Sequence, residues 1–254
     1  MRIITGERAP ATGDGGFNPA WQRHVSAYRL TADLLPQSLV LDVGCGTGHS
    51  FPALQRPTVG VDLSVDALRG QQRPAAAADL RKLPFRTGAA KGLISSHSIE
   101  HVPDPERGVA EFARVLSDDG TALVITPNRL TFGKPDEVID PYHFLELDPA
   151  QLRALCETAF EDVTVLGVCG SARYQEIVAE EKRTMYRVLA LDPLRLRRFV
   201  PRWLLQKLYD FALTFTRRKP DARRQAISQD DFTLRDTDLD AADDLVAVCR
   251  KPRR

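Results

Sequence analysis

The sequence predicts an α/β protein with a doubly wound, mostly parallel sheet of seven strands, an antiparallel edge strand and a helical insertion. Short apolar runs alternate with segments of helical periodicity along most of the chain. The first run, residues 39–43, is apolar at every position but one, as in a strand buried on both faces of a parallel sheet. Three glycines in five residues follow it, and acidic residues end the next two runs.

The expected elements follow one another at the spacing of right-handed crossovers. The seven strands are expected at residues 39–43, 58–62, 75–78, 92–96, 121–126, 163–168 and 244–249. Capped or amphipathic helices are expected at residues 18–35, after Ser64, at 105–116 and from Pro149. We expect one domain over residues 17–254, with a helical cap inserted at about 171–240 and a tail or lid at 1–16.

Composition limits what kind of protein this is. A chain of 254 residues with 43% hydrophobic residues can bury a core, which excludes wholesale disorder. No apolar run reaches the ~18–20 residues of a membrane span, and residues 1–16 lack the apolar core of a secretory signal, so we expect a cytoplasmic protein. A disulfide scaffold or structural zinc site is disfavoured because no paired spacing connects Cys45, Cys156, Cys169 and Cys249.

Polar residues directly after the strands form the candidate ligand site, because ligands of such sheets bind outside the carboxyl ends of the strands. The glycines of residues 44–48 permit a sharp turn and close approach of the backbone to a ligand. A dinucleotide fingerprint would place Gly or Ala where His49 stands, so the spacing favours another adenosine-containing ligand. Asp62 can accept the ribose hydroxyl protons and Asp79 an adenine amino proton, although an Asp that caps a helix would look the same.

In these motifs the chain resembles the class I S-adenosylmethionine-dependent methyltransferases, in particular the small-molecule group of type 11. The matching segments are residues 41–48, 60–62, 78–80, 83–85, 98–104 and 114–116, with Gly120. The resemblance covers roughly residues 20–170. It implies a Rossmann-like fold and S-adenosylmethionine as the methyl donor, with S-adenosylhomocysteine as the product.

The resemblance also implies roles for individual residues. The glycine loop would hold the methionine part of the cofactor, and Tyr28 would close over it. The implied cofactor-binding residues are Tyr28, Asp42, Gly44, Cys45, Gly46, Gly48, Asp62, Leu63, Asp79, Leu80 and His97. The implied acceptor-binding residues are Glu100 and Tyr142.

Methyl transfer from a sulfonium mainly requires an aligned nucleophile and the exclusion of water, and a hydroxyl acceptor also needs a general base. Imidazole suits this role at neutral pH, so the candidates are His97 and His101 after the fourth strand and His143 after the fifth, and we expect His101 and His143 to be the catalytic residues. A purely structural hydrogen bond is the alternative for each. The favoured acceptor is a hydroxyl on a sugar, an oligosaccharide or another small molecule. The alternatives are a quinone, a lipid or a secondary metabolite, and a non-catalytic cofactor-binding scaffold.

The residue usage suggests a source. Abundant Arg, Ala, Asp and Val with little Lys suits a GC-rich bacterial genome. The chain is in this respect similar to the actinobacterial sugar O-methyltransferases that act in polysaccharide biosynthesis.

Two segments of the sequence contain residues that could bind a metal ion, but we assign no metal site to either. Residues 97–101 match an inverted zinc-protease pattern, which works on an extended helix, but Pro103 disfavours such a helix here. Asp136, Glu137 and Asp140 near His143 offer oxygen ligands for magnesium, which stays possible, but charged loops are usually only solvated.

The expected insertion is basic. Residues 171–226 hold 14 Lys and Arg against 6 Asp and Glu, a net charge of +8, whereas the whole chain carries +1. Its apolar stretch within 194–219 predicts a packed cap helix, a dimer interface or an interfacial helix on anionic lipid. Pro201 interrupts the stretch, and apolar residues wrap most of it, so burial is favoured over membrane contact. We expect a monomer or homodimer, with no nucleic-acid partner because no aromatic and basic residues interleave as a stacking platform.

Overall fold

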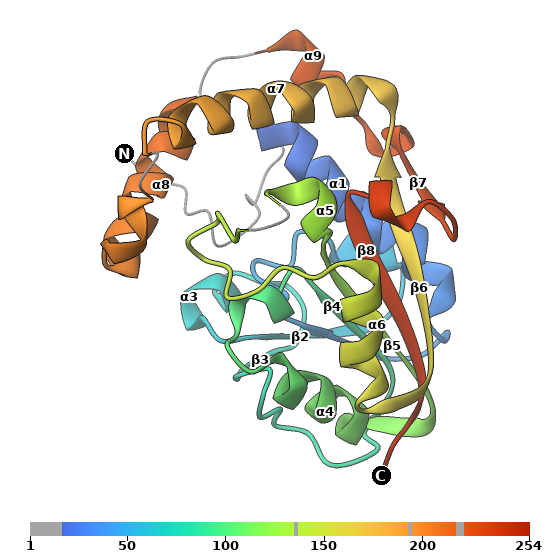
Figure 1. Cartoon of the computed structure of the whole chain (residues 1–254). Coiled ribbons are helices and arrows are strands. Elements are labelled where there is room, and N and C mark those ends of the chain that lie inside the picture. Colours follow the sequence, from blue (N-terminus) through green and yellow to red (C-terminus); the bar gives the residue numbers. More distant parts are fainter. Residues whose placement is uncertain (1–16, 135–136, 193–194, 217–220) are drawn as a thin grey trace.

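A single sheet of eight strands runs through the molecule, with helices against both of its faces (Figure 1). The computed structural model describes residues 17–134, 137–192, 195–216 and 221–254, so the expected tail at 1–16 lies outside the described residues. The strand order is β3-β2-β1-β4-β5-β8-β6-β7. The strands are β1 (Val40–Val43), β2 (Thr58–Asp62), β3 (Ala75–Ala77), β4 (Ala90–Ser96), β5 (Leu116–Pro127), β6 (Phe160–Gly170), β7 (Phe232–Arg235) and β8 (Asp244–Pro252).

The predicted doubly wound sheet is confirmed, with two differences at its far end. Strands β1 to β5 pair in parallel, β8 is antiparallel to both β5 and β6, and β7 is antiparallel to β6. The antiparallel edge strand is therefore β7, an eighth strand within the expected insertion. The strand predicted from residue 244 lies inside the sheet, and its first six residues are buried, as suits a strand covered on both faces.

Several of the helices begin at a residue whose side chain caps them. The helices are α1 (Asn18–Thr31), α2 (Phe51–Leu54), α3 (Val65–Leu68), α4 (Pro105–Val115), α5 (Arg129–Phe132), α6 (Pro149–Glu157), α7 (Ala172–Leu189), α8 (Arg202–Thr216) and α9 (Ala222–Gln225). Asp148 and Gln151 form a capping box at α6, and the Ser64 hydroxyl accepts a hydrogen bond from the Ala67 amide at α3. These caps fix where the crossover helices leave the carboxyl ends of the strands.

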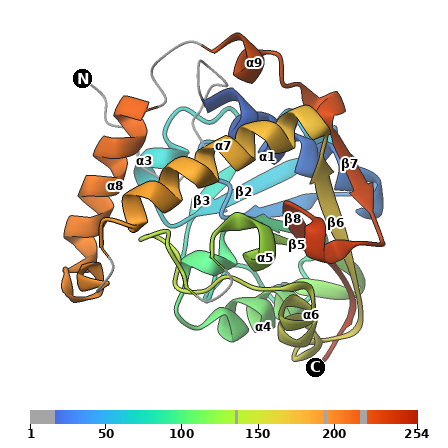
Figure 2. The same cartoon turned by 45° about the horizontal axis from the view of Figure 1, so that its top comes forward.

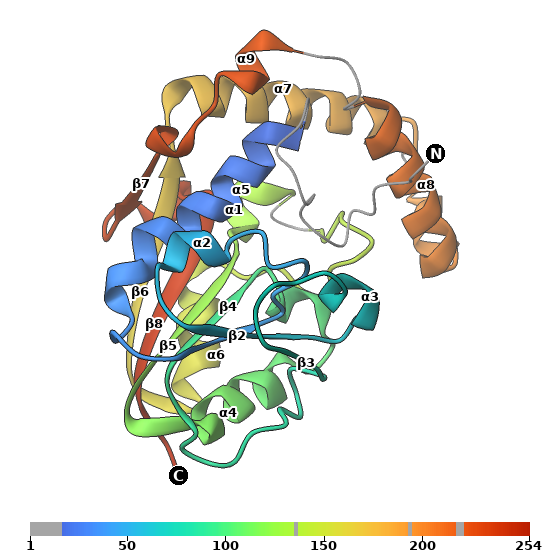
Figure 3. The same ribbon diagram turned by 180° about the vertical axis from the view of Figure 1, so that it is seen from behind.

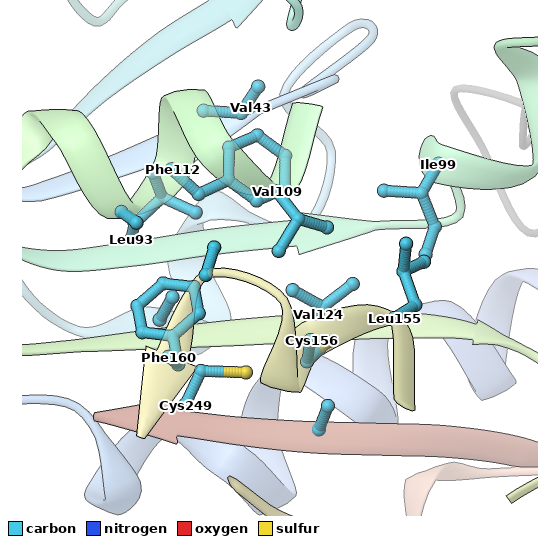
Figure 4. Close-up of a cluster of buried hydrophobic side chains, with 14 of the residues drawn as sticks. Val43, Leu93, Ile99, Val109, Phe112, Val124, Leu155, Cys156, Phe160 and Cys249 are labelled. Carbon is cyan, nitrogen blue, oxygen red and sulfur yellow. The ribbon is translucent and has the colours of Figure 1, made fainter. Parts of the chain in front are cut away.

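Two apolar layers hold the sheet, one on each face. Helices α4 and α6 pack on one face, where Phe112, Phe160 and Cys156 meet the strands (Figure 4). Helices α1 and α7 cover the other face with Tyr28 and Ile177. Neighbouring residues of one strand belong to opposite layers, so the continuous apolar runs in the sequence reflect burial on both sides.

The segment from 171 to 240 lies largely over and beside α1. Helix α7 crosses above α1, and α8 stands at the side of the molecule (Figure 2). Pro201 immediately precedes α8, so residues 194–215 do not form one uninterrupted helix, as expected. Among the described residues, no helix combines the length and apolarity needed to cross a membrane.

Candidate functional site

A cavity of about 500 Å³ lies at the carboxyl ends of the parallel strands, where the sequence predicted a ligand site. Its wall combines the loop after β1, the residues that follow β2, β3 and β4, the end of β5, helix α1 and the loop of residues 140–144. The predicted residues that line it are Tyr28, Gly44, Cys45, Gly46, Asp62, Leu63, Asp79, Leu80, His97, Glu100, His101 and His143. Asp42, Gly48 and Tyr142 are not among the lining residues.

The glycine loop owes its path to left-handed backbone and close packing. Gly44 has φ +80°, and a Cβ there would lie 1.9 Å from the Ser98 hydroxyl oxygen. Gly46 has φ +54°, and a Cβ there would meet no atom within 4 Å, because this residue faces open space. Glycine is the residue that adopts such φ values without strain, so the loop can present its backbone to a ligand at Gly46.

Asp62 holds the loop in place. One of its carboxylate oxygens accepts a hydrogen bond from the Gly46 amide at 2.8 Å, and the other accepts from the Ser64 amide at 2.8 Å. The Gln71 side chain also donates to the Gly46 carbonyl at 2.6 Å. Asp62 therefore shapes the loop as well as facing the cavity, and Gln71 is a supporting residue that no sequence motif marks.

Two of the predicted cofactor residues act from behind the loop. Asp42 accepts a hydrogen bond from the Tyr28 hydroxyl at 2.9 Å, and burial raises the pKa of its carboxyl group to about 7. Gly48 has φ +73°, and a Cβ there would come within 2.6 Å of the Phe51 ring. Asp42 thus fixes Tyr28, and Gly48 permits the turn, while their predicted role in cofactor binding stays a prediction.

Cys45 lines the cavity as a neutral thiol. Burial raises the pKa of this thiol to about 12, and the charge of Asp42 raises it further. A thiolate nucleophile is therefore disfavoured at this position, and Cys45 serves as part of the wall.

The residues after β3 form a charged rim that the sequence only partly predicted. Asp79 accepts hydrogen bonds from two nitrogens of the Arg81 guanidinium group at 3.0 and 2.6 Å and from the backbone amide of the same residue at 2.8 Å, which holds the pKa of the Asp79 carboxyl group below the ordinary value. Arg81 also donates to Asp104 at 2.6 Å. Arg81 lines the cavity beside Asp79 and Leu80. The sequence analysis did not predict Arg81 as part of the site, because no motif marks a residue that pairs with an acid two positions before it.

A buried line of charges lies beneath the cavity. His97 adopts a left-handed backbone with φ 50°, and its ring nitrogens lie 3.5 Å from a Glu100 oxygen and 3.4 Å from an Asp244 oxygen. Arg23 lies 3.3 Å from the same oxygen of Asp244. Burial alone would lower the pKa of His97, but Asp244 and Glu100 raise it to about 9. His97 is therefore an imidazolium that joins two carboxylates.

All five histidines of the chain line this one cavity, although they come from distant segments. The His24 and His97 ring centroids lie 4.0 Å apart. Burial and the charge of His97 lower the pKa of His24 well below its ordinary value, and burial lowers that of His49 to about 4. His24 and His49 are thus neutral wall residues, and neither was predicted as part of the site.

His143 and His101 share the part of the cavity next to Glu100. The Nδ1 atom of His143 lies 3.1 Å from a Glu146 carboxylate oxygen, and that of His101 lies 3.1 Å from the Tyr142 carbonyl oxygen. Both partners accept hydrogen bonds, so each Nδ1 carries a hydrogen and each Nε2 remains the lone-pair nitrogen. Burial lowers the pKa of His143, but Glu146, Glu100 and Asp140 outweigh burial and raise it above the ordinary value.

Tyr142 acts through its neighbours instead of facing the cavity as predicted. Its hydroxyl donates to Asp210 of α8 at 2.7 Å, while its carbonyl receives His101. Its contribution is to position the loop of residues 140–144. That its side chain binds the acceptor stays a prediction.

Glu100, His101 and His143 offer one ligand atom each, and these atoms lie within 4.8 Å of one another. The negative charge of Glu100 is already balanced by the His97 imidazolium, however. Burial alone would raise its pKa, but the hydrogen bond and charge of His97 help lower it to about 2. The three side chains therefore form a compact polar cluster in the cavity wall, in which Glu100 is already paired with His97.

The described residues of the two metal patterns noted in the sequence, neither of which was assigned, have the following surroundings. Residues 99–101 form a single 3-10 turn, so the inverted zinc-protease pattern does not lie on an extended helix. Glu137 accepts from Arg197 at 2.7 Å, and Asp140 accepts from the Tyr142 amide at 2.8 Å and the Tyr209 hydroxyl at 3.1 Å. Asp136 lies outside the described residues.

Sequence relatives identify the family. Residues 41–124 match the methyltransferase domain family. The chain is similar to a probable S-adenosylmethionine-dependent methyltransferase of Mycolicibacterium smegmatis, with 30% identity over 267 residues that cover 98% of this chain and 95% of the relative. A probable S-adenosylmethionine-dependent methyltransferase of Mycobacterium tuberculosis is 31% identical over 187 residues, which cover 69% of this chain and 68% of that protein.

Solved structures agree on the fold. A methyltransferase of Thermotoga maritima, described as a possible histamine N-methyltransferase, has a TM-score of 0.62 at 15% identity and covers 92% of each chain. The cyclase SpnF has a TM-score of 0.55 at 15% identity and covers 98% of this chain and 88% of its own. At such identities the likeness shows the fold alone.

Fold and family match together define a Rossmann-like methyltransferase domain. The chain belongs to the class I S-adenosylmethionine-dependent methyltransferases, and it is an enzyme that uses S-adenosylmethionine to methylate small molecules. The enzyme class and the methyl donor predicted from the motifs are thereby confirmed.

Proposed function

We propose that this enzyme methylates a hydroxyl group of a sugar, an oligosaccharide or another small molecule, with His143 as the general base. The observation that carries the proposal is the buried pair of His143 and Glu146, whose Nδ1 and carboxylate oxygen lie 3.1 Å apart, with His143 in the wall of the cavity. A neutral hydroxyl is a poor nucleophile, so a base that removes its proton as the bond to carbon forms accelerates the reaction.

The His143 and Glu146 pair has the arrangement that such a base needs. Glu146 accepts the Nδ1 hydrogen of His143, which fixes the ring and leaves Nε2 to take the proton of the acceptor. The carboxylate then stabilises the imidazolium that forms. His101, whose Nε2 is likewise the lone-pair nitrogen, orients the acceptor beside it, since the two ring centroids lie 5.0 Å apart.

The residues at the other strand ends suit the cofactor, which supplies a methyl group already activated by the sulfonium. Asp62 would accept the ribose hydroxyls, and Asp79 with Leu80 would contact the adenine. The Gly46 backbone faces open space at the cavity wall, as a loop that holds the methionine part requires. Tyr28, held by Asp42, closes this end of the cavity.

A sugar-like acceptor fits the remaining wall. The aromatic rings of Phe132, Phe144 and Tyr209 lie in the same cavity as the carboxylates of Glu100 and Asp140. Aromatic faces that cover an apolar ring surface, together with a few polar groups that receive hydroxyls, are the usual means of orienting such a ligand. An adjoining cavity of about 480 Å³ shares Phe132, Asp140 and Tyr209 with the first and leaves room for a longer acceptor.

The adjoining cavity also supports a second candidate, a quinone or lipid acceptor. Its lining includes Ile139, Ile177, Val178 and Met185, which would suit an apolar tail. The enzyme forms S-adenosylhomocysteine only when it methylates the acceptor that is supplied, so the two candidates predict product formation with different acceptors. A panel of free sugars and short oligosaccharides, run beside a panel of quinols and hydroxylated lipids, separates them.

The base assignment is tested with His143→Gln. We expect turnover to fall by about a hundredfold or more, while the dissociation constant for S-adenosylhomocysteine stays near that of the wild type, because His143 acts on the acceptor. Initial rates and calorimetric titration measure the two quantities. Undiminished turnover in the variant would remove His143 as the base.

A further inference from the structure

Helix α8 turns its polar face inward. Four polar side chains at helical spacing each form a hydrogen bond with the loop of residues 140–144. They are Arg202, Gln206, Tyr209 and Asp210. Arg202 donates to the carbonyls of residues 141 and 143 at 2.7 and 2.6 Å, and Gln206 donates to that of residue 141 at 3.2 Å. The Tyr209 hydroxyl donates to the Asp140 carboxylate at 3.1 Å, and the Asp210 carboxylate accepts from the Tyr142 hydroxyl at 2.7 Å.

The opposite side of α8 is apolar and exposed. Trp203 is 59% exposed, Leu208 57% and Phe211 57%, and Phe199 in the turn before the helix is 84% exposed. A surface helix of a globular protein normally shows the reverse arrangement, with its apolar stripe toward the core. We call these four side chains, with Lys207, the outer face of α8.

Basic charge accompanies this outer face. Residues 186–211 contain six Arg and Lys but only two Asp, and no Glu. Two of the basic residues are engaged within the protein, because Arg202 binds the loop of residues 140–144 and Arg197 donates to Asp192 at 3.1 Å and to Glu137 at 2.7 Å, whereas Arg187 is exposed. Lys207 is exposed, and its ammonium lies 5.3 Å from the centre of the Trp203 ring. The segment therefore combines exposed aromatic and aliphatic side chains with a surplus of positive charge.

We propose that the outer face of α8 docks on the surface of an anionic lipid bilayer. Apolar and aromatic side chains that enter the headgroup boundary, with basic residues that meet anionic headgroups, are the two contributions that bind an interfacial helix. A second copy of the chain is a poorer occupant, because a two-fold contact would bring the same basic segment of each copy together. Pro201 does not oppose this, since it lies just before α8.

The position of α8 suits such docking. The helix stands away from the sheet at the side of the molecule (Figure 3). Its inner face holds the loop that carries His143, and Tyr209 lines the catalytic cavity. Docking would thus bring the cavity close to the membrane surface. The proposal concerns binding to lipid and does not depend on the acceptor assigned above.

The test measures binding of the full chain to sedimented vesicles made of equal parts phosphatidylcholine and phosphatidylglycerol. We expect binding to these vesicles that weakens with added salt and is absent from pure phosphatidylcholine. The double variant Trp203→Gln/Leu208→Gln should reduce the partition coefficient about tenfold or more, and Lys207→Glu about fivefold. Thermal unfolding and S-adenosylhomocysteine binding verify that the variants are folded.

Two matched control variants carry the same kinds of substitution at exposed positions outside α8. Leu39→Gln alters an exposed leucine before β1, and Lys251→Glu alters an exposed lysine in β8, so both should bind vesicles like the wild type. Absence of vesicle binding by the wild type overturns the proposal, as does equal loss of binding in the controls. A concentration-dependent dimer that Leu208→Gln dissociates, without vesicle binding, would show that a second copy covers the face instead.

Discussion

Asp62 joins the glycine loop to the start of α3, one carboxylate oxygen on each. Its position at the end of β2 also places it in the cavity wall, so a single carboxylate both shapes the glycine loop and lines the cavity. Sequence reasoning predicted a ligand contact for Asp62 from its place directly after a strand. The bond to the Gly46 amide became visible only in the folded chain.

Replacement of this residue by alanine tests both roles. We expect Asp62→Ala to weaken binding of S-adenosylhomocysteine by about tenfold to a hundredfold, since charge-assisted hydrogen bonds to the ribose and the loop are lost. Isothermal titration calorimetry measures the affinity. Asp66→Ala, which removes an exposed carboxylate on α3, is the matched control and should bind like the wild type. Equal affinity in both variants would refute the ribose assignment.

The pH dependence of turnover follows from His143. Glu146, Glu100 and Asp140 raise the pKa of this imidazole above its ordinary value, although burial opposes them. A base must be neutral to act, so kcat/KM should rise with pH, with an apparent pKa above about 6.5. Glu146→Gln should lower kcat and move this rise to lower pH, because one of the groups that favour the imidazolium is gone. A pH profile unchanged by the variant contradicts the proposed pair.

The packing around the loop after β1 restricts which residues can occupy its positions. Gly44 and Gly46 both have positive φ, but only Gly44 is enclosed, against Ser98 at the end of β4. A glycine-rich motif therefore contains residues required for different reasons. Gly44 is needed so that two chain segments can approach each other, whereas Gly46 faces open space in the cavity wall.

Two alanine substitutions separate these reasons. Gly44→Ala should destabilise the fold by more than about 2 kcal/mol, since strained backbone and a steric overlap add together. Gly46→Ala should cost about 1 kcal/mol, from backbone strain alone, and should mainly weaken cofactor binding. Denaturant unfolding and calorimetry give both values. Equal losses of stability in the two variants would argue against the packing of Gly44 on Ser98.

The buried charges of Arg23, Asp244, His97 and Glu100 connect parts of the molecule that are far apart in the sequence. Arg23 belongs to α1, Asp244 begins β8, and His97 and Glu100 follow β4. Breaking a buried ion pair leaves an uncompensated charge, which is strongly unfavourable. This network therefore ties the leading helix to the centre of the sheet and to the floor of the cavity.

Global stability should depend on pH through His97. Its pKa of about 9 in the folded protein exceeds the value of ~6.5 expected in the unfolded chain. The stabilisation is fully present below pH ~6.5 and is lost as pH rises through about 9. Urea unfolding at several pH values measures this slope. His97→Gln should flatten it, and an unchanged slope would show that His97 is not the group responsible.

Local patterns in the sequence determined the strands around the site, the glycine loop and the acidic residues after β2 and β3. Runs of apolar residues, caps and turn glycines act over a few residues, so they can be recognised without the fold. Tertiary structure alone decided which histidines meet in one cavity, that β8 lies inside the sheet beside the short edge strand β7, and that α8 turns its apolar face outward. Those features depend on contacts between residues tens to hundreds of positions apart, as between Arg23 and Asp244, and no short pattern encodes such a contact.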